Sequence, residues 1–341
     1  MADHTSIEWT DATWNPVTGC STVSPGCDNC YAIRVSHRLA ANPNVKIRAR
    51  HEDLTDEDEH GELDWTGEVR LNEDMLDRPL HWKRPRRIFV NSLSDLFHPG
   101  LSDEAIARVF AVMALAPQHT FQVLTKRPQR MAEWFGDPFW LVRVIEHAEE
   151  MWGRLSSSAK FAAGGWWADG AWPLPNVWLG TSIESDRYAF RADHLRRTPA
   201  AVRFVSAEPL LGPLPSLNLD GIDWLIVGGE SGPAARPMHP DWVRDLRDRC
   251  HAPVTVGDEF HPLGSTLFFF KQWGDWLGFS PDAYGESITL AATTGAVHKD
   301  WPGDRMSASV RVGKKAAGRL LGGRTWDEVP ASRHEATAVS Q

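Results

Sequence analysis

The sequence has no long apolar run, few cysteines and no excess of positive charge. No stretch approaches the roughly 18 apolar residues that a membrane-spanning helix needs. Residues 1–5 lack the basic segment and following apolar run of a targeting peptide. Four cysteines in 341 residues, three of them close together, do not have the pattern of a disulfide framework. We therefore expect a protein of the cytoplasm, where cysteines stay reduced.

The charge and composition exclude some classes of partner. A formal net charge of −9 excludes a generally basic surface that coats nucleic acid, but it leaves local basic patches open. The most basic segment is 81–87, and its Trp82 would suit a contact with phosphate and base. The alternative is a solvated flank before a strand. With 42% hydrophobic residues, the chain can bury one large core or two modest ones.

Three of the four cysteines, Cys20, Cys27 and Cys30, lie within eleven residues in a C-x6-C-x2-C pattern. Thiolates are soft ligands that select zinc, copper or an iron–sulfur cluster. A structural zinc ion normally takes four protein ligands, whereas four irons held by three cysteines keep one iron open for a small molecule. The composition of 31–41 predicts a helix directly after Cys30, and a helix N-terminus favours a thiolate.

The C-x2-C half of this motif, the aromatic Tyr31 after it and the stretch 14–20 resemble a divergent branch of the radical S-adenosylmethionine superfamily. The chain is also similar, over nearly its whole length, to a family of phage and prophage proteins of unassigned activity. The usual superfamily motif is C-x3-C-x2-C, so the first gap here is three residues longer. The resemblance implies a [4Fe–4S] cluster on the three cysteines. It also implies that S-adenosylmethionine binds at the open iron and is cleaved there to start radical chemistry. Its partners would be an electron donor and a phage- or prophage-encoded protein.

A repeated unit, an apolar run that ends in polar residues, organises the rest of the chain. The runs are 87–90, 120–124, 176–179, 202–205, 224–227 and 267–270. Continuous apolar runs predict parallel strands buried on both faces. Helices are expected at 102–116, 139–154, 185–197 and 240–250. Together with a first strand within 7–16, these predict an α/β fold, a partial or complete parallel (β/α) barrel of about six to seven units.

This barrel is expected to cover residues 1–280. The acidic segment 51–64 is predicted to be a solvated loop inserted in it. Beyond residue 280 the alternation of strand and helix is lost. We therefore expect 281–341 to be a small irregular C-terminal extension, with a hairpin within 284–311, a short helix at 314–321 and a disordered tail.

In such barrels the strand ends carry the site, so the polar residues after the strands are candidates for binding S-adenosylmethionine. They are Ser92, Asp95, Lys126, Arg127, Ser182, Glu184, Glu208, Gly228, Gly229 and Glu230, with Thr181 as a further polar residue. The alternative for each is a strand-end cap or a tight turn. Cys250 shares an apolar helix face with Val243 and Leu246, which predicts a buried side chain and no ligand role.

The resemblance and the chemistry assign roles to some of these residues. By position, Ser92 or Asp95 would hold the cofactor's amino group. Lys126 or Arg127 would pair with its carboxylate. The stretch 228–230 resembles the superfamily's Gly-Gly-Glu element but follows a later strand, so it is assigned to ribose, adenine or substrate.

Three functions remain open from the sequence. The first is a radical S-adenosylmethionine enzyme, acting on a nucleic-acid base or nucleotide because of segment 81–87 and the tryptophan-rich loop 161–175; a peptide substrate is the alternative. The second is a zinc-stabilised nucleic-acid-binding protein that uses the three cysteines and a histidine such as His37. The third is a scaffold for a partner protein. The bound metal distinguishes the first two.

Overall fold

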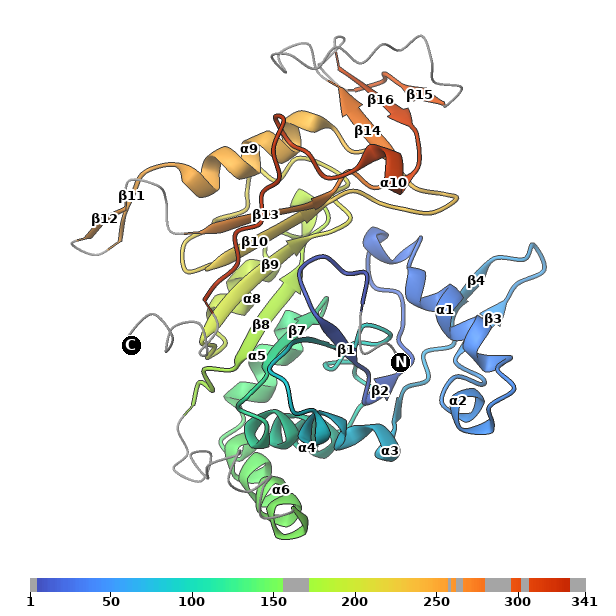
Figure 1. Ribbon diagram of the computed structural model, residues 1–341, viewed down its shortest axis with the longest axis vertical. Helices are drawn as coiled ribbons and strands as arrows, with labels where there is room; N and C mark the ends of the chain where they lie inside the picture. Colours follow the sequence, from blue (N-terminus) through green and yellow to red (C-terminus); the bar gives the residue numbers. More distant parts are fainter. Residues whose placement is uncertain are drawn as a thin grey trace. The chain divides into compact units, whose positions relative to one another are not determined.

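The computed structural model describes residues 5–155, 172–256, 259–261, 266–279, 296–301 and 307–331. Seven parallel strands form one sheet in the order β1-β6-β7-β8-β9-β10-β13. They are β1 (Ala12–Trp14), β6 (Arg87–Val90), β7 (Thr120–Thr125), β8 (Val177–Ser182), β9 (Val202–Ala207), β10 (Trp224–Gly228) and β13 (Leu267–Gln272). The predicted α/β class, a partial parallel (β/α) barrel, is confirmed, and each predicted apolar run forms a strand of this sheet (Figure 1).

Contacts divide the chain into two compact units. The first comprises residues 1–181, 193–203 and 331–341, and the second comprises 182–192 and 204–330. The predicted boundary at residue 280 stays a prediction, because 280–295 lie outside the described residues. Among the described residues, no helix is long and apolar enough to cross a membrane.

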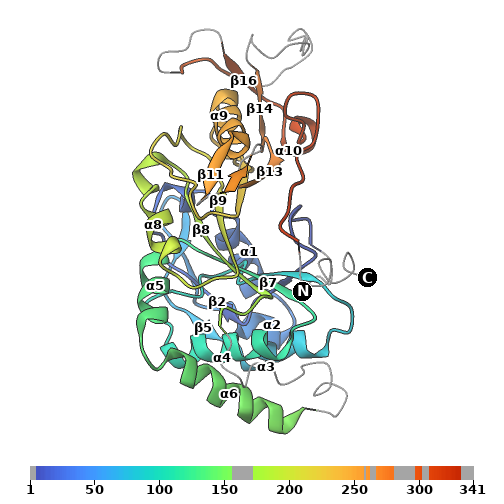
Figure 2. The same ribbon diagram turned by 90° about the vertical axis from the view of Figure 1, so that its left-hand side faces the viewer.

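The first unit contains six helices within its described residues. They are α1 (Tyr31–Ala40), α2 (Val45–Ala49), α3 (Glu73–Leu76), α4 (Asp103–Leu115), α5 (Pro128–Gly136) and α6 (Trp140–Arg154), with 3-10 turns η1 (Pro25–Cys27) and η2 (Arg78–His81). Helix α4 begins where the Ser102 hydroxyl accepts a hydrogen bond from the Ala105 N–H, and ten of its thirteen side chains are buried. Helix α6 packs alongside α4 (Figure 1, Figure 2). The predicted helices at 102–116 and 139–154 are therefore confirmed.

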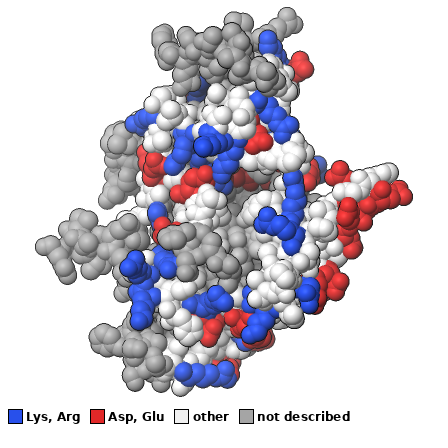
Figure 3. Space-filling model, turned by 45° about the vertical axis from the view of Figure 1, so that its right-hand side comes forward, with Lys and Arg blue, Asp and Glu red and all other residues white. Residues whose placement is uncertain are grey.

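The predicted acidic loop contains a hairpin. Strand β3 (Thr55–Glu57) pairs antiparallel with β4 (Leu63–Trp65), and a second short pair joins β2 (Val17–Thr18) to β5 (Arg70–Leu71). The Asp58 carboxylate accepts hydrogen bonds from the His60 and Glu62 N–H groups, both 2.8 Å long, which closes the turn. The acidic side chains of this hairpin face solvent, as predicted, and gather at the right-hand edge of Figure 3.

In the second unit, the predicted helix 185–197 is divided. A 3-10 turn η4 (Asp186–Tyr188) precedes α8 (Arg191–Arg196), and the Asp186 carboxylate accepts hydrogen bonds from the backbone N–H and hydroxyl of Ser216. Helix α9 (Pro240–His251) matches its prediction. The remaining elements are the hairpin β11 (Val254–Val256) and β12 (Glu259–His261), the three-stranded sheet β14 (Trp276–Phe279), β16 (Ala308–Arg311) and β15 (Val297–His298), and α10 (Lys314–Ala317).

The C-terminal part of the described chain packs against β13. The Phe270 N–H donates to the Trp326 carbonyl, and the Phe268 N–H donates to the Glu328 carboxylate. The predicted short helix 314–321 ends early, at Ala317, because Gly318 has a φ of +67°. The predicted hairpin is described only in part, as the antiparallel pair β15–β16, and residues 332–341 of the predicted tail lie outside the described residues.

Candidate functional site

The cysteine loop leaves β1 and β2 at the end of the strands where polar residues follow β6 and β7. Gly19 forms a parallel bridge with Ser94, and the Ser94 hydroxyl donates to the Val17 carbonyl. The Asn15 amide oxygen accepts hydrogen bonds from the Ser92 hydroxyl and the Leu93 N–H. The turn after β6 therefore fixes the start of the cysteine loop, and the Ser92 hydroxyl is already engaged in that task.

The three thiols are free and half-buried, and the C-x2-C part forms a tight turn. The Cys30 N–H donates to the Cys27 carbonyl at 3.0 Å, and α1 starts at the next residue. Burial raises the pKa of the Cys30 thiol, against which the Ala32 N–H and the Lys126 ammonium act. The Tyr31 hydroxyl donates to the Ser92 carbonyl at 2.6 Å, so the aromatic residue of the motif ties α1 to the turn after β6.

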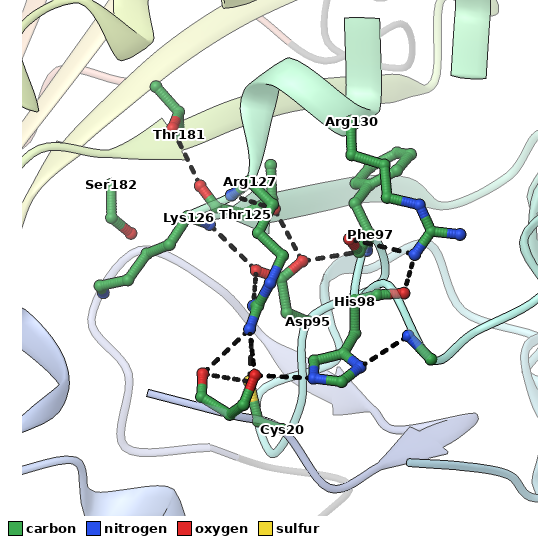
Figure 4. Close-up of polar contacts among 12 residues, drawn as sticks. Cys20, Asp95, Phe97, His98, Thr125, Lys126, Arg127, Arg130, Thr181 and Ser182 are labelled. Carbon is green, nitrogen blue, oxygen red and sulfur yellow. Dashed lines mark hydrogen bonds and ion pairs between the residues drawn. The ribbon is translucent and has the colours of Figure 1, made fainter. Parts of the chain in front are cut away.

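Cys20 lies beside the side chain of Arg127, which follows β7. The Arg127 Nη1 is 3.7 Å from the Cys20 Sγ, and its Nη2 donates to both the backbone and side-chain oxygens of Ser21, at 2.9 and 2.8 Å (Figure 4). Burial and the charge of Asp95 raise the pKa of the Cys20 thiol to about 12, and the guanidinium opposes them.

Asp95 is the anchor of this arginine. Its carboxylate accepts hydrogen bonds from the Thr125 hydroxyl at 2.7 Å and from the Phe97 and Lys126 N–H groups at 2.9 and 3.1 Å. It also forms an ion pair with Arg127 at 2.9 Å, in which Asp95 is buried and Arg127 is partly buried. The carboxylate predicted to bind the cofactor's amino group is thus engaged by four donors of this chain.

His98 is a member of the network that the sequence did not indicate. Its Nδ1 accepts a hydrogen bond from the Gly100 N–H, so the neutral ring carries its proton on Nε2, which lies 2.8 Å from the Ser21 hydroxyl. Burial and the Arg127 charge lower the pKa of His98 to about 4, which keeps the ring neutral. Arg130 binds the carbonyls of Phe97, His98 and Leu101 and holds this loop. No local pattern marks His98 or Ser21, because their contacts join distant segments.

Lys126 differs from its neighbour. Within the described part of the chain no hydrogen bond or ion pair of its ammonium group is found, and in Figure 4 its side chain extends away from Asp95. Its charge acts on the Cys30 thiol. Of the two cations predicted to meet a carboxylate, Lys126 is therefore the one whose charge is available.

The predicted residues of the second unit lie at the ends of β8, β9 and β10 and are also engaged. Glu184 is fully buried and pairs with the buried Arg191 at 3.0 Å. Glu208 pairs with Lys271 at 3.0 Å and accepts a hydrogen bond from the Ser206 hydroxyl. Glu230 is bound by the backbone and guanidinium of Arg236. Thr181, in the first unit, donates to the Thr125 carbonyl, and the Ser182 carbonyl accepts from Arg191. Their contact with a ligand stays a prediction.

Packing accounts for the two glycines of 228–230. A Cβ at Gly229 would stand 2.0 Å from the Trp273 carbonyl oxygen, and one at Gly228 would stand 2.5 Å from the Glu208 carboxylate. Beside them, the buried Gln272 amide donates to the Gly229 carbonyl and the Ser231 hydroxyl, and its Oε1 has no partner in the described residues. Close backbone packing therefore accounts for both glycines, and the predicted contact of this stretch with ribose, adenine or substrate stays a prediction.

The basic segment lies at the opposite end of the strand from the cysteines. It precedes β6, whereas the turn that binds the cysteine loop follows β6. Arg86 stacks over the Trp82 ring at 5.0 Å, and Lys83 and Arg84 face solvent. In the tryptophan-rich loop, residues 161–171 lie outside the described residues. Within the first unit, the basic segment is therefore a surface separate from the thiols.

The charges around the three cysteines suit a metal group that is bound by thiolates. Two of the three thiols lie near cations, and Cys30 begins a helix, whose N–H groups favour an anion. A bound metal would deprotonate the Cys20 and Cys30 thiols, whose pKa burial raises. As the side chains are placed, no group of three or more Cys, His, Asp or Glu that could hold a metal ion is found among the described residues. His37, the proposed fourth zinc ligand, contacts the Thr55 hydroxyl. Cys250 is buried on α9 with Val243 and Leu246, as predicted.

Fold and site together define a class, an α/β protein with a parallel partial barrel and three free thiols near the ends of its first strands. The chain matches, over residues 4–330, the family described as "Protein of unknown function (DUF5131)", and it belongs to that family. No curated protein and no solved structure matches it.

Gly19 tests how tightly the cysteine loop is fixed. Both Gly19 and Gly67 have a φ of +88°, but a Cβ at Gly19 would stand 2.0 Å from the Glu68 carbonyl oxygen, whereas one at Gly67 would meet nothing within 4 Å. We expect Gly67→Ala to cost about 1–2 kcal/mol of the free energy of unfolding, through backbone strain alone. Gly19→Ala should cost about 1–3 kcal/mol more, through overpacking. Urea unfolding measures both, and equal losses would contradict the close approach.

Proposed function

We propose that this protein is a radical S-adenosylmethionine enzyme whose Cys20, Cys27 and Cys30 hold a [4Fe–4S] cluster. The observation that carries the proposal is the contact of the Arg127 guanidinium with the Cys20 sulfur, next to a second cation, Lys126, after β7. Arg127 faces Cys20, and the charge of Lys126 acts on Cys30. An anionic cluster and the carboxylate of a bound S-adenosylmethionine both need positive charge nearby.

The chain's own residues would divide the work. The three thiols bind the metal group, and Lys126 binds the carboxylate of the methionine moiety. Arg127 stays with Asp95 and Ser21 and does not turn to the substrate side. When bound, the cluster supplies the single electron that breaks the bond between the sulfonium sulfur and the 5′ carbon. An external electron donor must provide that electron, and the cytoplasm, as a reducing compartment, suits this requirement.

For the substrate we propose a nucleic-acid base or a nucleotide. The support is the exposed basic surface at Lys83 and Arg84 with the stacked pair Trp82 and Arg86, which suits contact with a phosphate backbone. This surface lies at the other end of β6 from the thiols. It would therefore bind a distant part of a long substrate, and the base that reacts would lie near the thiols. A phage- or prophage-encoded protein remains the proposed partner.

The test is a purification without oxygen followed by an assay with a strong reductant. We expect brown protein that contains iron and sulfide. With dithionite it should convert S-adenosylmethionine into equal amounts of methionine and 5′-deoxyadenosine, slowly even without substrate. Colourless protein that contains zinc would favour the zinc-stabilised binding protein. A fully loaded cluster that yields no 5′-deoxyadenosine, with or without nucleic acid, would overturn the enzymatic proposal.

A further inference from the structure

The Arg127 side chain is held in place by contacts with several groups of the protein. Its guanidinium reaches three groups at once, the Asp95 carboxylate, the two Ser21 oxygens and the Cys20 sulfur. Its side chain is 11% exposed and that of Asp95 is 7% exposed. Arginine presents five donors in a planar fork, so one side chain can bridge a strand end, a loop backbone and a sulfur, whereas lysine cannot.

The orientation of the fork is fixed from behind. The Asp95 carboxylate accepts hydrogen bonds from the Thr125 hydroxyl and from the N–H groups of Phe97 and Lys126. These three bonds fix the orientation of the carboxylate. The Arg127 N–H also donates to the Thr125 hydroxyl at 2.8 Å. These contacts therefore hold the Arg127 side chain in one conformation, with its guanidinium group beside Cys20.

We propose that Arg127, which Asp95 orients, is a positioning residue. It fixes the Cys20 end of the cysteine loop and donates a hydrogen bond to the Cys20 sulfur when the cluster is bound. This inference rests on the proposed function. The other end of the loop has its own support, through α1 and the contact of Tyr31 with Ser92. The Gly19–Ser94 bridge and the contact of Ser21 with His98 also hold the Cys20 end, and Arg127 adds the contact that reaches the Cys20 sulfur.

A hydrogen bond and a positive charge at a cluster sulfur stabilise the reduced, more negative cluster. Losing them makes the cluster harder to reduce, a change that loss of packing elsewhere does not produce. The informative variants are Arg127→Lys, which keeps the charge but not the fork, and Asp95→Asn, which keeps the shape but releases the arginine. The matched control is Arg191→Lys, because Arg191 forms an even more deeply buried ion pair with Glu184 at a strand end in the second unit.

Two measurements test the proposal. The first is hydrogen exchange of residues 20–30 in metal-free protein, where both variants should exchange faster than wild type and the control should not. The second is a potentiometric titration of the iron-loaded protein followed by electron paramagnetic resonance. We expect the reduction equilibrium of Arg127→Lys, which loses the hydrogen bond to sulfur, to weaken at least about tenfold, which for one electron is about 59 mV more negative. Asp95→Asn also removes a negative charge near Cys20, so this variant is compared by exchange alone.

Each outcome decides a separate point. Unchanged exchange in both variants overturns the anchoring role, and an unchanged potential overturns the hydrogen bond to sulfur. Equal effects in Arg191→Lys would show general destabilisation and also overturn the inference. A wild-type protein that takes up no iron defeats the proposed function instead, and the exchange measurement alone then decides whether Arg127 anchors the loop.

Discussion

Replacing Cys20, Cys27 or Cys30 with alanine is expected to remove bound iron, whereas Cys250→Ala is expected to leave it in place. In the proposed site each of the first three would supply one of three protein ligands, so the loss of any one would leave the cluster short of a ligand. Losing a group that merely supports a metal ligand costs about 10–100-fold in metal affinity, and losing the ligand itself should cost more. The iron and sulfide content of protein purified without oxygen measures this.

Cys250 is the matched control for this series. It is buried on α9, and burial raises the pKa of its thiol, as expected of a small apolar side chain in a core. If Cys250→Ala emptied the site as completely as the other changes, the argument for an open iron would collapse. If zinc rather than iron disappeared from the first three variants, the binding-protein function would be supported.

Lys126→Met is expected to weaken the binding of S-adenosylmethionine by roughly ten- to a hundredfold while iron content stays at the wild-type level. A hydrogen bond to a charged group contributes about 1.5–3 kcal/mol, and each 1.4 kcal/mol is a factor of ten in the dissociation constant. The change should affect ligand binding and leave the fold intact. Within the described residues the Lys126 ammonium group has no hydrogen bond or ion pair that the substitution would remove.

Equilibrium dialysis of S-adenosylmethionine against the iron-loaded protein measures this affinity. Lys126→Arg keeps the charge and should retain most of the binding. Lys46→Met removes an exposed lysine on α2 and should change nothing. If Lys126→Met bound S-adenosylmethionine as tightly as wild type, the assignment of the carboxylate to Lys126 would be wrong. Loss of iron in the same variant would instead place Lys126 in the support of the cluster.

The sequence predicted some residues of the candidate site but not the contacts between them. The three cysteines stand out by residue type and spacing, and the polar residues after β6 and β7 do lie beside the loop that carries them. The sequence paired Lys126 or Arg127 with a ligand carboxylate, and that pairing stays a prediction. The structure adds that Arg127 pairs with Asp95 and contacts Cys20. Glu184 likewise has a buried partner, Arg191, that no spacing rule indicated.

The strands of the parallel sheet and the helices α1, α4, α6 and α9 could be predicted from the sequence, because burial leaves a local record in the pattern of apolar residues. The short strands β2 to β5 and the helices α2, α3 and α5 were not predicted. The runs at 87–90 and 224–227 are continuously apolar, and they became β6 and β10 in a parallel sheet. The tertiary structure decided which polar groups meet. Arg127 and Cys20 are 107 residues apart in the chain, and Ser21 and His98 are 77 apart. Such contacts depend on the order and register of the strands, and no short window of sequence records either.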